Sequence, residues 1–134
     1  MIVLVSPGQG AQKPGVLSPW LELPGVAERL AELSDAAGTD LVEHGTRSDA
    51  ETIRDTAIAQ PLLVAAGIVA GEALADGRSD VADVMAGHSV GEVTTTALAG
   101  VLSPVDAMRL VAVRATAMAK AAATRPALTS SAPR

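Results

Sequence analysis

The chain has 134 residues, 49% of them hydrophobic, which suits one domain with a true core. Its formal net charge of −5 argues against nucleic-acid binding, because there is no surplus of Lys and Arg to neutralise phosphates. The lack of cysteine excludes disulfides and a Cys nucleophile, and two histidines are too few for an ordinary zinc site, so we expect no metal.

The first predicted element is a strand over residues 2–5, a uniformly apolar run typical of a strand that is buried on both faces. A loop over residues 8–12 follows. Apolar residues then recur at helical spacing over 26–37, and Gly38 supplies the stop. The start of the chain lacks the basic flank and long apolar core of a signal peptide.

A capping-box pattern at residues 48–51 predicts a short helix that runs toward Asp55. Residues 61–75 form a helix that is apolar nearly all round, as is usual at the centre of a larger domain. Its longest apolar run, 61–71, falls short of the roughly 18 to 20 residues that span a bilayer. We therefore expect a cytoplasmic protein that does not enter a membrane.

The second half begins with β-branched residues over 81–86, whose end we interpret as a second strand. A helix over residues 91–98 follows and closes at Gly100. A serine cap, a proline and an acid over 103–106 then open a last helix that runs to about residue 123. The tail, residues 124–134, has no periodicity and is predicted to be disordered.

Strand, helices, strand and helices in this order indicate an α/β fold. Two strands are fewer than the three or more that a stable sheet generally needs. The sheet and the apolar central helix therefore both predict that further structure is needed to cover them.

The stretch from Gly87 to Glu92 reads Gly-His-Ser-Val-Gly-Glu and fits the G-x-S-x-G pattern of a nucleophile elbow, with Ser89 as nucleophile. Side chains at Gly87 and Gly91 would clash within so tight a turn. A strand before the motif and a helix after it favour this interpretation over a glycine-flanked serine in an ordinary loop. The amide of Val90 would then face the oxyanion of a tetrahedral intermediate.

Four elements in order resemble the malonyl-CoA:acyl carrier protein transacylase family. They are the GHSxGE signature at 87–92, the PGQGxQ loop at 7–12, the Gln-Pro element at 59–61 and an arginine at position 114. The resemblance implies an α/β-hydrolase-like core with an inserted ferredoxin-like subdomain. Since the chain is under half the usual family length, we expect a partial core, residues 1–123, that lacks the subdomain and the C-terminal part.

The resemblance also implies the roles of the site residues. Ser89 attacks the thioester of malonyl-CoA and carries the malonyl group, which then passes to acyl carrier protein, with no bound cofactor. The backbone amides of Gln9 and Val90 form the oxyanion hole. Arg114 grips the malonyl carboxylate.

Arg114 also stands out on its own, because Leu110, Val111 and Met118 place it on an apolar stripe of a helix. A guanidinium there needs an anion, and a carboxylate held in a bidentate manner is its natural partner. A salt bridge or a side chain that reaches to solvent remains the alternative. Arg109 is expected to pair with Asp106 at the surface.

The resemblance assigns the general base to a histidine further downstream, in a part that this chain lacks. His88 adjoins the nucleophile, but neighbours diverge at a sharp turn, and His44 is expected in a solvated loop. Glu92 suits the first turn of a helix without a catalytic role. We therefore expect a truncated or fragmentary chain that is inactive alone.

Two other functions stay open: a serine esterase with the same elbow, and a non-catalytic remnant. A plain esterase has no need for the carboxylate clamp at Arg114. The start at Met1, directly before the first strand, favours a stand-alone enzyme of fatty acid synthesis over a domain of a polyketide synthase.

Overall fold

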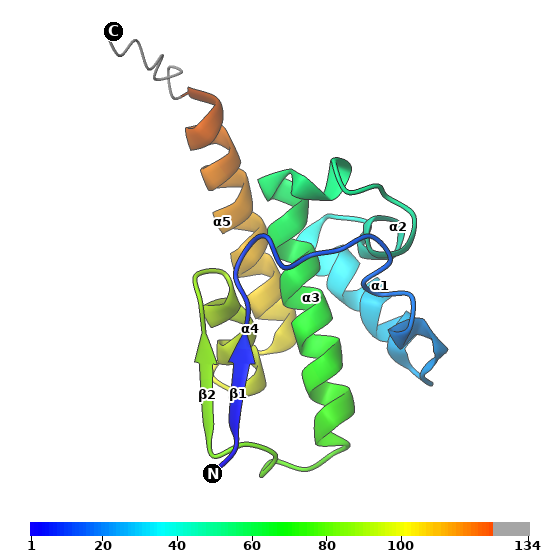
Figure 1. Cartoon of the computed structure of the whole chain (residues 1–134), viewed down its shortest axis with the longest axis vertical. Coiled ribbons are helices and arrows are strands. Elements are labelled where there is room, and N and C mark those ends of the chain that lie inside the picture. The colour runs from blue at the N-terminus through cyan, green and yellow to red at the C-terminus, as the bar shows by residue number, and fades with distance from the viewer. Residues whose placement is uncertain (125–134) are drawn as a thin grey trace, which may run out of the picture.

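A computed structural model describes residues 1–124 and places helices beside a short parallel sheet (Figure 1). The α/β class expected from the sequence is thus observed. In chain order the elements are β1 (Val3–Ser6), η1 (Trp20–Glu22), α1 (Val26–Ala37), α2 (Leu41–Thr46), η2 (Thr52–Arg54), α3 (Thr56–Ala75), β2 (Val84–Gly87), α4 (Gly91–Leu98) and α5 (Pro104–Thr124).

The central helix α3 starts five residues earlier than the apolar pattern predicts. Asp55 caps it, because its side chain accepts a hydrogen bond from the Ala57 amide at 2.8 Å. Pro61 therefore lies inside the helix. Helices α1, α2, α4 and α5 all contact α3, and the buried core gathers along it. Four neighbouring helices thus cover much of α3, and the expected exposure of apolar surface is observed at its C-terminal end, where Leu74 is 55% exposed.

At 20 residues with a mean hydropathy of 1.7, α3 is long and apolar enough to cross a membrane by those two measures. This corrects the expectation drawn from the shorter run 61–71. However, 56% of this window is buried inside the fold. That burial is what the core helix of a globular domain requires.

The sheet consists, within residues 1–124, of β1 and β2 in parallel register, with Val3 opposite Val84 and Ser6 opposite Gly87. Val3 and Val5 are 45% and 65% exposed, whereas Ser6 is buried. The prediction of a strand buried on both faces is therefore wrong. One face of β1 meets the helices and the other is open, so burial alternates along the strand.

Several predicted boundaries are confirmed. Helix α1 covers 26–37 and ends at Gly38 with φ of 64°, and α4 covers 91–98 as expected. Ser103 caps α5 by accepting a hydrogen bond from the Asp106 amide at 3.0 Å. The helix extends to Thr124, one residue into the predicted tail, and the rest of that tail lies outside the described residues.

The segment between α1 and α3 was the least well predicted. Helix α2 was not foreseen, and it contains His44, which is therefore helical and half-buried rather than part of a solvated loop. At the next turn Asp49 accepts the hydrogen bond from the Thr52 amide at 2.8 Å. The observed element there is the short η2, and Asp49, not the expected Ser48, accepts from its first amide.

Candidate active site

Ser89 lies in the tight turn between β2 and α4, with a backbone φ of 56°. This left-handed conformation is strained for a residue other than glycine. A Cβ added at Gly87 would lie 2.3 Å from the Glu92 amide nitrogen, and one at Gly91 would lie 2.2 Å from the Ser6 carbonyl oxygen. The expected clash of side chains at both glycines is confirmed, and the turn pushes the serine side chain outward into solvent.

Arg114 reaches Ser89 from α5. Its Nη2 donates a hydrogen bond to Ser89 Oγ at 3.2 Å, and its Nη1 donates to Gln60 Oε1 at 2.6 Å. The guanidinium is thus placed beside the serine by an uncharged partner, which leaves its positive charge without a carboxylate in the described residues. Arg109 differs, since it pairs with Asp106 at 3.1 Å on the surface, as expected.

Gln60 joins the segments of the site, a role that the sequence did not reveal. Its side chain is only 1% exposed, and its Nε2 donates to Gln9 Oε1 at 3.4 Å and to Met118 Sδ at 3.3 Å. Because its Oε1 accepts from Arg114, the amide orientation is fixed at both ends. A buried glutamine within an otherwise apolar helix was the signal that could have identified it.

Gln9 is held next to this network by its own side chain, whose Nε2 donates to Thr56 Oγ1 at 3.1 Å. The side chain of Gln12 stabilises the same loop, because it accepts a hydrogen bond from the Gly10 amide and donates one to the Ile53 carbonyl. Within residues 1–124 neither the Gln9 amide nor the Val90 amide has a hydrogen-bond acceptor. Neither amide is thus used by the described fold, although Val90 as a residue is fully buried.

The two histidines are engaged elsewhere. His44 Nδ1 lies 2.9 Å from Ser48 Oγ, and the exposed ring of His88 lies against Gly8. In the part of the chain that the structure describes, neither ring hydrogen bonds to Ser89, and no group of three His, Cys, Asp or Glu residues could hold a metal ion. The described residues thus bring together Ser89, Arg114, Gln60 and Gln9 without a base.

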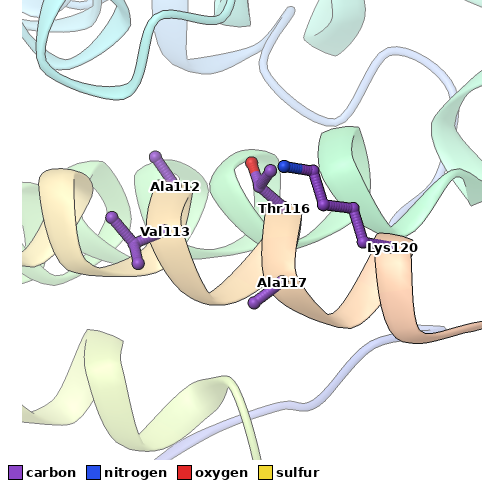
Figure 2. Close-up of a pocket in the computed structure, with 5 residues that line it drawn as sticks. All are labelled: Ala112, Val113, Thr116, Ala117 and Lys120. Carbon is purple, nitrogen blue, oxygen red and sulfur yellow. The ribbon is translucent and has the colours of Figure 1, made fainter.

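An open hollow of about 470 Å³ lies on α5, and Figure 2 shows the side chains that line it: Ala112, Val113, Thr116, Ala117 and Lys120. It involves neither Ser89 nor Arg114. Its lining is mostly apolar, with the Thr116 hydroxyl and the Lys120 amino group as its polar groups. We place the candidate site at the turn after β2 and leave this hollow out of it.

Comparisons with known proteins identify the family of the chain. The profile of the family described as acyl transferase domain matches residues 3–132. The malonyl CoA-acyl carrier protein transacylase of Mycobacterium tuberculosis is 51% identical over 130 residues, which are 94% of this chain and 42% of that relative.

Two solved structures extend the match. The crystal structure of MCAT from M. tuberculosis superposes with a TM-score of 0.89 at 52% identity, and it is matched over 94% of this chain and 42% of its own. A type II PKS acyl-carrier protein in complex with its malonyl-transacylase gives a TM-score of 0.80 at 34% identity, over 89% of this chain and 39% of that one. This chain therefore spans under half the length of these relatives. Because the profile covers nearly all of it, and the fold agrees, the chain belongs to the acyl transferase domain family.

Proposed function

We propose that these residues form the nucleophile-bearing part of an enzyme that moves a malonyl group from coenzyme A to acyl carrier protein. The observation that carries the proposal is the position of the Arg114 guanidinium, 3.2 Å from Ser89 Oγ. A cation beside a serine nucleophile is suited to an acyl group that ends in a carboxylate. Malonyl is such a group, and acetyl is not.

In the proposed reaction Ser89 Oγ attacks the thioester carbonyl carbon, so that a C–O bond forms and the C–S bond to coenzyme A breaks. The serine proton passes to a general base and then to the leaving thiolate. The phosphopantetheine thiol of the carrier protein next gives its proton to the base and attacks the malonyl ester. A new C–S bond forms, the C–O bond to Ser89 breaks, and the base returns the proton to Ser89 Oγ. The family resemblance assigns the base to a histidine downstream of this segment of the enzyme.

The tetrahedral intermediate of each step carries a negative oxygen. We assign its stabilisation to the Gln9 and Val90 amides, both of which are free of acceptors within residues 1–124. Val90 directly precedes α4, where the helix dipole also favours negative charge. The strained turn at Ser89 supports the role of nucleophile elbow.

Gln60 completes the assignment as a positioning residue. It accepts a hydrogen bond from Arg114 and donates one to the Gln9 side chain. The carboxylate clamp and the loop that carries the oxyanion donor are thereby held by a single buried amide. A complete enzyme would add the remaining sheet, a ferredoxin-like subdomain and the base to the partial core of residues 1–123. We propose that it acts in the cytoplasm in fatty acid synthesis.

The alternative of a plain serine esterase is less well supported, because an esterase gains nothing from Arg114 beside the nucleophile. The test uses a hybrid enzyme in which residues 1–124 replace the matching segment of the M. tuberculosis transacylase. Incubation with malonyl-CoA should add one malonyl group by intact mass, and Ser89→Ala should abolish the adduct. Ser103→Ala, which removes a serine from the start of α5, should keep it. A malonyl adduct that persists in Ser89→Ala would refute the assignment.

A further inference from the structure

The loop that carries Gln9 and the turn that carries Val90 touch at Gly8 and His88. A Cβ at Gly8 would lie 2.7 Å from His88 Nδ1 and 3.1 Å from the His88 carbonyl oxygen. The φ of Gly8 lies outside the left-handed region, so its backbone conformation does not call for glycine. A side chain at position 8 would therefore meet His88 and would not strain the Gly8 backbone.

His88 is anchored through its backbone on both sides. Its amide donates to the Ser6 carbonyl at 3.1 Å, which continues the parallel ladder one residue beyond Gly87. Its carbonyl accepts from the Gly91 amide at 3.0 Å. The ring itself has no hydrogen-bond partner among residues 1–124, although His88 directly precedes the nucleophile in the sequence. Its contact with Gly8 is therefore one of packing.

We propose that His88 is a positioning residue whose ring packs on the Gly8 backbone and sets the distance between the Gln9 and Val90 amides. This inference rests on the proposed function, since it assumes that both amides bind the oxyanion. Two donors from separate segments must converge to about 2.7–3.1 Å from one oxygen. The ladder between the two segments ends at the hydrogen bond from the His88 amide to the Ser6 carbonyl, and the contact between His88 and Gly8 extends this constraint to the adjacent Gln9.

The first test replaces the ring in the hybrid enzyme. His88→Ala should lower kcat about tenfold through a looser oxyanion hole, while KM for malonyl-CoA stays within about twofold because Arg114 is untouched. His88→Phe should retain most of kcat, since the ring remains and only the titratable nitrogens are lost. His44→Ala, the matched control on α2, should leave both constants unchanged.

The second test probes the contact from its other side. Gly8→Ala places a methyl group where the ring lies and should lower kcat by a similar factor. Removal of the ring relieves that overlap, so the double variant should be no slower than the slower single variant. Equal thermal midpoints of wild type and His88→Ala, whose side chain is exposed, would separate this effect from a loss of folding.

Three results would overturn the inference. The first is an unchanged kcat in His88→Ala, and the second is a double variant in which the losses in kcat of the two single variants multiply. The third is a His88→Phe variant that is as slow as His88→Ala and has an altered pH profile, which would indicate proton transfer by His88. Failure of the proposed function has a different signature, because the malonyl adduct would then survive in Ser89→Ala whatever His88 does.

Discussion

Two substitutions at Ser89 distinguish the cost of its backbone conformation from the role of its hydroxyl group. A φ of 56° costs a residue with a Cβ roughly 1–2 kcal/mol, and glycine avoids this cost. Ser89→Gly in the hybrid enzyme should therefore raise the free energy of unfolding by about 1 kcal/mol. Ser89→Ala keeps the Cβ and should not. Both variants should lose the malonyl adduct, and urea unfolding followed by circular dichroism compares their stabilities. Equal stability of the two would show that the turn stores no strain at this residue.

Arg114 determines substrate choice in the proposed enzyme. Arg114→Ala should weaken malonyl transfer by about 2 kcal/mol, or about 30-fold in kcat/KM, the lower end for a lost charge pair because the side chain is only half-buried. Transfer of an acetyl group, which lacks the carboxylate, should change far less. Arg109→Ala, on the same helix but paired with Asp106 at the surface, is the matched control. Similar losses for both acyl groups would indicate that Arg114 is structural.

Among single residues, the sequence predicts those whose role depends on their immediate neighbours in the chain. The spacing of Gly87, Ser89 and Gly91 predicts the turn, because a tight backbone leaves no room for a Cβ. The hydrogen bonds of Gln60 could not be predicted in the same way. Its partners Gln9 and Arg114 lie 51 and 54 residues away along the chain, and only packing brings them together.

At the scale of elements, glycines set how closely α4 approaches its neighbours. Gly91→Ala would place a Cβ against the backbone carbonyls of Ser6 and Pro7, and should destabilise the fold by about 1–3 kcal/mol. Gly71→Ala on α3 meets only the end of the Leu98 side chain, which can rotate away. The two variants compare a Cβ that meets backbone with a Cβ that meets a side chain.

Thermal unfolding of both variants in the hybrid enzyme checks this prediction. The Gly91→Ala variant should also acylate more slowly, because its methyl group separates β1 from the turn that carries Ser89. A Gly91→Ala variant as stable as Gly71→Ala would show that the backbone yields at this point.

The elements that could be predicted are those whose sequence patterns lie within the element itself. Helices α1, α4 and α5 carry both a periodic pattern and an end signal such as Gly38 or Ser103, and their boundaries were correct. Helix α2 has six residues, too few to establish a period, and was missed. The burial of β1 was also missed, because a short apolar run does not show which of its faces is covered.

At the scale of the whole molecule, the open face of the sheet controls the behaviour of residues 1–134 expressed alone. Val3 and Val5 are exposed on β1, beside the exposed Val84 of β2. Unpaired strand edges and exposed apolar side chains favour association. We expect this polypeptide to self-associate and to lack transacylase turnover, since no base contacts Ser89 within the described residues.

Light scattering and a malonyl-transfer assay on the purified polypeptide check this prediction. Lysine at positions 3 and 5 (Val3→Lys with Val5→Lys) should reduce association without restoring turnover. A monomer with transfer near that of the hybrid enzyme would contradict the prediction, and would require a base among residues 1–134.

The pairing of β1 with β2 also determines the order in which the molecule is made. The first strand leaves the ribosome early, and its partner Asp83, whose carboxylate accepts from the Ile2 amide, follows 81 residues later. At roughly 5–20 residues per second, β1 waits about 4–16 s for its partner. Helices α1 to α3, whose contacts are shorter in sequence, can pack during that interval. The Gln9 loop and the Ser89 turn meet only when the strands pair, so the candidate active site is among the last parts of this structure to form.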